Sequence, residues 1–194
     1  MARMVAISAT ALVAFCLAVA CARKTPQEKL EDARRVLQKR DTWGAIVLAH
    51  EVLRDMGENT TGPLALEART ILVNSYSLDR NWKECRRVLD EIIKQCGLNS
   101  GEGQQAAESR IQTFEFSGQT TAAIEQTRAF LEAATTGTLF WSSLNLRWAN
   151  YLRQFSQATT AQTVLAKVLT NKQVGDDERF RALSLLDACY ATTK

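Results

Sequence analysis

The chain has 194 residues, of which 46% are hydrophobic, and it contains only 2 Pro and 9 Gly. This composition argues against a disordered chain and favours one all-α domain with a sizeable core. The formal net charge is +3, and acidic and basic residues are interleaved, so charge gives no reason to expect a nucleic-acid or polyanion partner.

An apolar leader begins the chain. Arg3 is followed by an uncharged run from Met4 to Ala22, and the small-x-small sequence Ala18-Val19-Ala20 stands just before Cys21. A short basic start, an apolar core and a small-residue cleavage site are the parts of a secretory signal peptide. The run is marginal for a permanent membrane span, which needs about 20 apolar residues. We therefore predict a signal peptide over residues 1–20.

The end of this leader, Leu17-Ala18-Val19-Ala20-Cys21, resembles the lipobox of bacterial lipoproteins. That motif usually has Leu three residues before the Cys, whereas here Leu17 stands four before it and Ala18 takes that place. The resemblance implies a lipid on Cys21, a short linker over residues 21–25, and a membrane-tethered protein of the cell envelope. In a Gram-negative cell, Ala22 after the lipidated Cys implies the periplasmic side of the outer membrane, because the usual retention signal is an Asp at this position.

Two alternatives stay open for the leader. Cleavage after Ala20 without lipidation would give a soluble periplasmic product. An uncleaved leader would be an anchor, and Arg23-Lys24 just after it could hold the domain inside the cell.

Helical periodicity and breakers alternate through the rest of the chain. The expected helices, in order, are Lys24–Arg40, Thr42–Met56, two helices within Leu66–Lys94 around a turn at Asp79–Asn81, Gln104–Phe116, Thr120–Ala133, Phe140–Phe155, Thr159–Thr170, and a last helix that Asp176 caps and that ends near Tyr190. The breakers between hairpins are Gly57–Pro63, Gly97–Gly103, Thr135–Thr138 and Asn171–Gly175.

The clearest hairpin lies within Leu66–Lys94. Its first helix places Leu72, Val73 and Tyr76 on one face, and its second places the apolar residues Cys85, Val88, Leu89 and Ile92 on one face. Neither helix buries its apolar stripe alone. We therefore expect Tyr76 and Leu89 to be buried between facing helices.

The hairpins repeat at a nearly fixed interval. Equivalent turns fall at Asp41, Arg80, Gly118 and Ser156, with steps of 39, 38 and 38 residues. Around these turns, four columns of equivalent residues align: Leu37, Tyr76, Phe114 and Leu152; Trp43, Trp82, Thr120 and Ala158; Ile46, Cys85, Ala123 and Ala161; Leu53, Ile92, Phe130 and Val168. A regular period of this length is typical of repeat proteins built from helical hairpins.

These columns resemble the tetratricopeptide repeat (TPR) over residues 25 to 170. That family has a large residue ahead of a Gly turn, an aromatic residue just after it and a small residue early in the second helix. The sequence departs from this pattern in three ways. Its period is longer than the family's, which is about 34 residues, and the turn Gly is kept only at Gly118. The position of the small residue is occupied by Ile46 in the first repeat and by Cys85 in the second. The resemblance implies an all-α, TPR-like α-hairpin solenoid over residues 26–190, with four hairpins stacked in a right-handed superhelix and a C-terminal cap helix.

A column of polar residues lies six positions before each turn. Its members are Arg35, Asn74, Gln112 and Asn150. Three residues further along, Ser77, Glu115 and Arg153 share the same face, with Gln38 in the first hairpin. The resemblance implies that this face lines a concave groove, where amides donate to and accept from a peptide backbone. The alternative is that these residues form the solvated sides of the helices.

The sequence shows no catalytic constellation and no metal or cofactor motif. His50 is the sole His, and its column, shared with Leu89, Thr127 and Leu165, predicts a partly buried packing role. Cys85 and Cys96 are eleven residues apart on one helix, about 16 Å, which is too far for a disulfide. Cys85 is expected to be a buried hydrophobe, and a Cys96–Cys189 bridge is disfavoured in a stack of repeats.

The function that these features favour is a non-enzymatic scaffold of the bacterial envelope, tethered at Cys21, that binds a peptide or protein on its concave face. The alternative of another class is an envelope enzyme subunit or regulatory subunit with a site in the groove, which would need titratable residues of strongly shifted pKa. A nucleic-acid-binding repeat protein is a third possibility, and Glu115 in the polar column argues against it.

Overall fold

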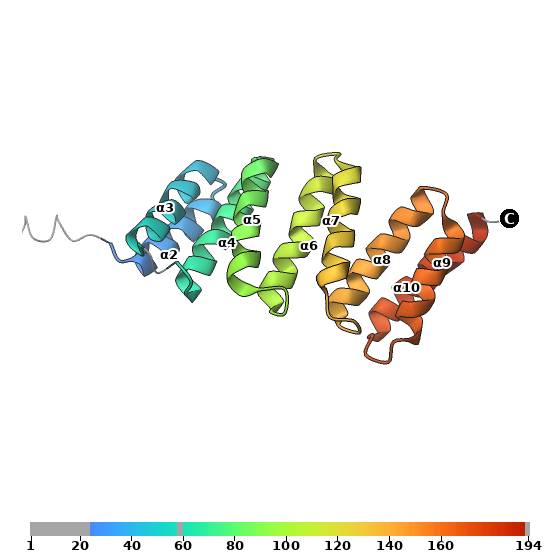
Figure 1. The fold of residues 1–194 in the computed structure, drawn as a ribbon. Helices are drawn as coiled ribbons and strands as arrows, with labels where there is room; N and C mark the ends of the chain where they lie inside the picture. The colour runs from blue at the N-terminus through green and yellow to red at the C-terminus, as the bar shows by residue number, and fades with distance from the viewer. Residues whose placement is uncertain (1–23, 58–59, 193–194) are drawn as a thin grey trace, which may run out of the picture. The chain divides into compact units, whose positions relative to one another are not determined.

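The computed structural model describes residues 24–57 and 60–192, and all regular secondary structure in these residues is helical (Figure 1). The helices are α2 (Pro26–Gln38), α3 (Thr42–Asp55), α4 (Pro63–Leu78), α5 (Trp82–Cys96), α6 (Gly101–Phe116), α7 (Thr120–Ala133), α8 (Leu139–Gln154), α9 (Ala158–Thr170) and α10 (Asp176–Thr192). The predicted all-α array of helical hairpins is confirmed. The predicted signal peptide and Cys21 lie outside the described residues.

The chain divides into two compact units, Met1–Ile71 and Leu72–Lys194, with the boundary inside α4. In the first unit α2 packs against α3. Leu30, Ala49 and Val52 are fully buried there, and the Lys29 Nζ on α2 forms ion pairs with Glu51 at 2.9 Å and Asp55 at 2.7 Å on α3. Apolar burial and these bridging charges together hold the first hairpin closed.

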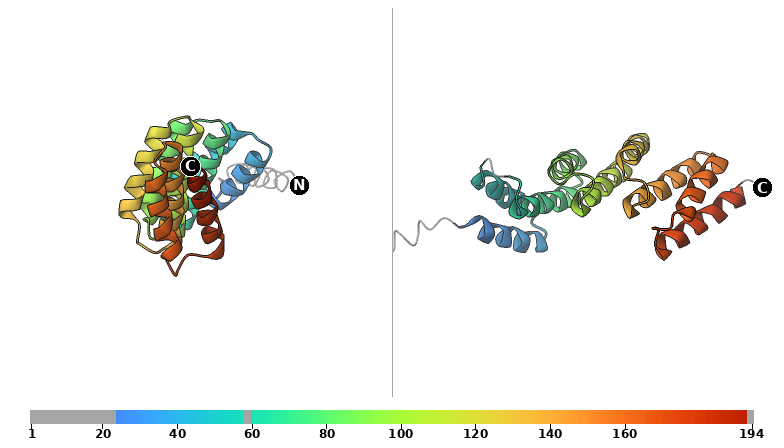
Figure 2. Two further views of the ribbon diagram at one scale, coloured as in Figure 1. Left: turned by 90° about the vertical axis from the view of Figure 1, so that its right-hand side faces the viewer. Right: turned by 60° about the horizontal axis from the view of Figure 1, so that its bottom comes forward.

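The second unit contains the end of α4 and all of α5 to α10. One core cluster joins α6, α7 and α8 through residues such as Ile111, Phe130 and Leu144. A second cluster joins α8, α9 and α10, and includes Leu165 and Cys189. Figure 2 shows these last three helices side by side, as the shared core requires.

Short polar side chains determine where most helices begin. Thr25 accepts a hydrogen bond from the Glu28 amide while the Glu28 carboxylate accepts from the Thr25 amide, a capping box that starts α2 at Pro26 rather than Lys24. Ser100 accepts from the Gly103 amide, so α6 begins at Gly101, three residues before the predicted start. Asp176 is the first residue of α10 and not its cap, because Arg179 donates its amide to the Gly175 carbonyl.

Each hairpin turn repeats one backbone arrangement. Arg40, Arg80, Gly118 and Ser156 have positive φ angles of 62°, 55°, 74° and 60°. The amide of the residue after each one donates to a carbonyl five positions back, from Asp41 to Val36, Asn81 to Tyr76, Gln119 to Phe114 and Gln157 to Leu152. This is the Schellman motif, which ends a helix and reverses the chain.

The motif corrects the predicted register of the first hairpin by one residue. The equivalent of Arg80 is Arg40, not Asp41, because Asp41 is the N-cap of α3 and accepts from the Gly44 amide at 2.8 Å. The first hairpin's member of each of the four predicted columns is therefore the preceding residue. These members are Val36, Thr42, Ala45 and Val52. Trp43, predicted to match Trp82, is 75% exposed.

The same shift explains why the prediction for His50 is wrong. His50 is exposed, and Ala49 is the buried equivalent of Leu89, Thr127 and Leu165. The same shift replaces Ile46 with Ala45 in the column of small residues. This column is then Ala45, Cys85, Ala123 and Ala161, and all four residues are buried. In the hairpin of α4 and α5 the predicted burial of Tyr76 and Leu89 is confirmed, at 9% and 2% exposure.

Candidate functional site

The predicted polar column lies on the first helices of the hairpins. In the second unit, α4 carries Asn74, α6 carries Gln112 and α8 carries Asn150. Asn74 and Gln112 are exposed and Asn150 is half-buried. These side chains line two hollows in the second unit, each of which contains residues from two or more helices.

The first hollow, named here the α4–α6 hollow, has a volume of about 130 Å³. Its lining includes Asn74, Ser77, Trp82, Ser109, Gln112 and Phe116. The Trp82 and Phe116 rings stack with centroids 5.9 Å apart, and Phe116 is 71% exposed. Amide and hydroxyl groups thus lie beside an accessible aromatic surface. The polar groups can form hydrogen bonds with the backbone of a peptide, and the aromatic surface can contact an apolar side chain of that peptide.

Cys85 also lines the α4–α6 hollow, and its thiol lies 3.7 Å from the Val73 carbonyl. Burial raises the pKa of this thiol to about 11, because an apolar surrounding disfavours the thiolate. The Cys85 thiol is therefore protonated at neutral pH and acts as a small core residue, as predicted.

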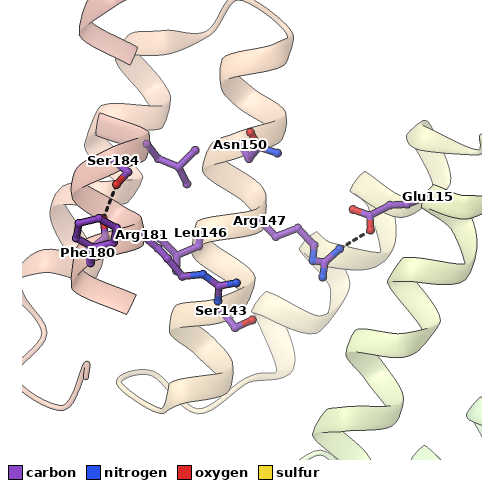
Figure 3. A pocket seen from close by; sticks show the side chains of 9 residues that line it. Glu115, Ser143, Leu146, Arg147, Asn150, Phe180, Arg181 and Ser184 are labelled. Carbon is purple, nitrogen blue, oxygen red and sulfur yellow. Dashed lines mark hydrogen bonds and ion pairs between the residues drawn. The ribbon is translucent and has the colours of Figure 1, made fainter. Parts of the chain in front are cut away.

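The second hollow, named here the α8–α10 hollow, is larger, at about 450 Å³ (Figure 3). Its polar and charged lining comprises Glu115, Ser143, Arg147, Asn150, Arg181 and Ser184. Phe180 of α10, which is 72% exposed, adds an accessible apolar wall, with Leu146 and Leu185 beside it. The last helix therefore supplies part of a mixed apolar and charged site in addition to covering the end of the core.

One polar cluster joins α6 to α8 at the edge of this hollow. The Arg147 Nη1 lies 2.5 Å from the Glu115 Oε2, and the Tyr151 hydroxyl donates to the Glu115 Oε1. Burial acts to lower the pKa of Arg147, but its hydrogen bond to Glu115 and the charge of that carboxylate outweigh this and raise it. Burial and the Glu115 carboxylate raise the pKa of Tyr151 to about 12. Both carboxylate oxygens are thus engaged inside the protein.

The structure brings some of the predicted binding residues together and separates others. Asn74, Ser77 and Gln112 line the α4–α6 hollow, whereas Glu115 and Asn150 line the α8–α10 hollow. Arg153 lies outside both linings, and its Nη2 donates to the Asn150 Oδ1 at 3.2 Å.

Arg35 belongs to the first unit and forms an ion pair with Asp32 of its own helix at 2.8 Å. With the register corrected, Arg34 takes the position six residues before the turn, and it forms an ion pair with Glu67 of α4. The inclusion of Arg35 in the column is therefore wrong by one residue, because it was counted from Asp41.

Several residues that line the two hollows were not among the predicted binding residues. Arg147 and Ser143 lie one and two turns before Asn150 on the same face of α8, so helical spacing alone could have found them. Phe180 and Arg181 line the hollow from α10, which was predicted only as a C-terminal cap helix outside the repeated columns. Phe116 lies just before the third turn, and its stacking on Trp82 depends on tertiary packing.

Two further classes of site are not found in the described part of the chain. No group of three or more His, Cys, Asp or Glu residues there could hold a metal ion. None of the helices in residues 24–57 and 60–192 has the length and apolarity to cross a membrane.

Of the comparisons with known proteins, only the one with solved structures finds a similar fold. No protein-family model matches the chain, and no curated protein sequence matches it. Among solved structures, nearly identical TPR-like repeats from a Podosopora anserina kinesin light chain candidate give a TM-score of 0.57 at 15% identity, over 88% of this chain and 89% of that one. A point variant of that protein gives the same values.

A candidate protein-binding protein from Bacteroides ovatus gives a TM-score of 0.47 at 11% identity, over 87% of this chain and 100% of its own. At 15% identity the similarity to the Podosopora anserina repeats concerns the fold alone. The chain accordingly has a TPR-like, all-α solenoid fold.

The raised pKa of Tyr151 predicts a loss of stability at alkaline pH. A group whose pKa is higher in the folded protein stabilises the fold below its unfolded pKa, near 10 for Tyr. That contribution falls as pH rises through about 12. Urea unfolding between pH 9 and 12 should therefore show a shallower decline in the free energy of unfolding for Tyr151→Phe than for the unsubstituted chain. Tyr190→Phe, at a residue 53% exposed, is the control, and equal slopes for Tyr151→Phe and the unsubstituted chain would contradict the assignment.

Proposed function

We propose that this chain is a non-enzymatic scaffold that binds a peptide or protein segment along the first helices of its second unit. The observation that carries the proposal is the lining of the two hollows, where Asn74, Gln112 and Asn150 lie beside exposed aromatic rings. Each amide offers both a donor and an acceptor, so it can pair with a peptide backbone whatever the sequence of that peptide.

The chemistry of the hollows supports binding over catalysis. The Tyr151 hydroxyl and the Cys85 thiol both have raised pKa values, so neither provides a base or a nucleophile at neutral pH. In the α8–α10 hollow, the Glu115 carboxylate is held by Arg147 and Tyr151. These groups consequently fix the shape of the site and do not form an acid–base pair poised for reaction.

The envelope location is part of the same proposal. It is supported by the sequence of residues 1–21, in which a basic start, an apolar core and the lipobox-like Leu17–Cys21 precede the first helix. A lipid on Cys21 would tether the domain to a membrane surface. The helical repeats would then present their first-helix face to other envelope proteins.

The binding face can be tested by removing its amides. A photo-crosslinking residue in place of Gln112 would capture the partner in the protein's own cells, and the affinity of that partner would then be measured directly. Each amide hydrogen bond contributes about 0.5–1.5 kcal/mol, so Asn74→Ala with Asn150→Ala should weaken binding about tenfold. The matched control is Thr121→Ala with Thr163→Ala, two exposed residues on the second helices α7 and α9. Unchanged affinity of the Asn double variant would contradict the proposed face.

The lipid anchor is tested separately. The Cys21→Ser variant should take up no radiolabelled fatty acid and should leave the membrane fraction, because the lipid is attached through the Cys thioether. Cys16→Ser is the matched control, since Cys16 leaves with the predicted signal peptide and labelling should persist. The proposal of a lipoprotein fails if the unsubstituted chain takes up no label.

A further inference from the structure

The outward face of α3 carries an exposed row of apolar and basic side chains. Trp43, Val47, His50 and Arg54 follow the i, i+4, i+7, i+11 spacing that places side chains in one row along a helix. Trp43 is 75% exposed and Val47 is 39% exposed, and the other two residues are also exposed. The opposite face of α3 is in the core, through residues such as Ala49. This row, named here the α3 stripe, therefore faces away from the first hairpin.

The apolar character of the α3 stripe is specific to the first hairpin. Trp43 and Val47 stand three and seven residues after the left-handed turn residue Arg40. In the other three hairpins the residues at these two positions are also exposed, and all of them are polar: Lys83, Thr121 and Thr159 at the first position, and Arg87, Glu125 and Thr163 at the second. Packing of the repeat therefore does not require apolar residues here, and the apolar area of Trp43 and Val47 is available to a surface outside the chain.

Basic residues lie at both ends of the apolar pair. Lys39 and Arg40 are exposed at the turn just before Trp43, and the side chain of Arg54, at the far end of the stripe, is 73% exposed. An accessible indole among cations is the composition of a protein surface that lies on anionic lipid. The indole prefers the headgroup region, and the cations are attracted to the lipid phosphates.

The acidic residues of α3 and its cap are engaged within the hairpin. Glu51 and Asp55 lie 2.9 Å and 2.7 Å from the Lys29 Nζ on α2, and Asp41 caps the start of α3. Glu51 also lies 4.0 Å from Arg54. Because Lys29 offsets part of the charge of these two carboxylates, they repel an anionic surface less strongly than they would alone.

The chain that precedes the first hairpin keeps the stripe close to any membrane that holds Cys21. Five residues lead from Cys21 to Pro26, where α2 begins, and they span at most about 17 Å, at about 3.5 Å per residue. The beginning of α2 lies beside the end of α3, as the pairing of Lys29 with Asp55 requires (Figure 1). The 14 residues of α3 extend about 21 Å. The tether is therefore shorter than α3 itself, and it enters the hairpin at the Arg54 end of the stripe.

We propose that the α3 stripe lies on the anionic surface of the membrane to which Cys21 is tethered, with the Trp43 indole among the headgroups and Lys39, Arg40 and Arg54 against the phosphates. This inference rests on the proposed lipid anchor, and it specifies how the anchored chain meets the membrane. A lipid alone leaves the orientation of a domain open. A second contact along α3 fixes the orientation of the first unit.

The test follows the tryptophan emission of the full chain, purified from membranes and reconstituted into vesicles. The vesicles are made of phosphatidylcholine with or without phosphatidylglycerol, and their upper acyl chains carry bromine, which quenches an indole on contact. Phosphatidylglycerol vesicles should quench the emission, and Trp43→Phe should reduce the quenched fraction by about half or more. Trp141→Phe is the control, since Trp141 packs against the core of the second unit, and it should leave the quenching intact.

Charge variants connect the contact to the basic residues. Lys39→Gln with Arg54→Gln should weaken the Trp43 quenching, as should added salt. Lys83→Gln with Lys94→Gln makes the same charge change at exposed positions of the second hairpin and should have no effect. Circular dichroism would verify that each variant keeps its helices. Equal Trp43 quenching without phosphatidylglycerol would overturn the assignment of an anionic surface.

A photo-crosslinker in place of Val47 separates lipid from protein as the occupant of the stripe. In the protein's own cells it should form adducts mainly with phospholipid, because Val47 is exposed in the middle of the row. Adducts mainly with a protein would overturn the inference and assign the stripe to a protein partner.

The inference and the proposed anchor fail in different ways. If the chain takes up the fatty-acid label at Cys21 and stays with the vesicles, but Trp43→Phe leaves the quenching unchanged, the inference is overturned while the anchor stands. If the chain takes up no label, the proposed anchor fails, and the inference that rests on it fails with it.

Discussion

Each hairpin depends on one hydrogen bond at its turn. The amide after the left-handed residue donates to a carbonyl five positions back, at 3.2 Å in the first hairpin and 2.8 Å in each of the other three. This bond sets where the first helix ends, where the second begins and how the second is rotated about its axis. In all four hairpins the residue five positions after the left-handed residue is small and buried, either Ala or Cys.

The polar face follows from the same constraint. Because Asn74, Gln112 and Asn150 each stand six residues before a left-handed turn residue, they occupy the same angular position on their helices. Their helices bury the opposite face, through residues such as Leu72 and Ala107. The turn thus places the position six residues before it outside the core. Packing does not determine which residue occupies this position.

Charged side chains form contacts between helices that belong to different hairpins and that no turn joins directly. Arg110 of α6 pairs with Asp90 of α5 at 2.5 Å, and Arg147 of α8 pairs with Glu115 of α6. The guanidiniums of Arg86 and Arg110 lie over the Phe114 ring, 4.4 Å and 5.4 Å from its centroid. These pairs connect consecutive hairpins of the second unit.

Periodicity predicted most of the fold because each helix buries one apolar stripe against its neighbours. It predicted α7 to the residue, and it placed Cys85, Val88, Leu89 and Ile92 in the core. The first hairpin was misaligned by one residue because its turn was placed at Asp41, whereas the left-handed residue is Arg40 and Thr42 is the equivalent of Trp82.

The site was harder to predict than the fold. The amides of Asn74, Gln112 and Asn150 were found because they repeat with the hairpins. The pairing of Glu115 with Arg147 and Tyr151 spans residues 32 and 36 positions apart, and the sequence carries no local signal for it. The contribution of Arg181 depends on which face of the last helix packs against α8 and α9, and one helix without a following repeat does not reveal that.

The register of the turns is the central claim, and the free energy of unfolding in urea tests it most directly. A non-glycine residue in the left-handed region costs about 1–2 kcal/mol, so Arg40→Gly should raise the free energy of unfolding by about 1 kcal/mol. Asp41→Gly, one residue later, should lower it by a few tenths of a kcal/mol through loss of the N-cap of α3. The opposite order, with Asp41→Gly stabilising and Arg40→Gly destabilising, would contradict the account.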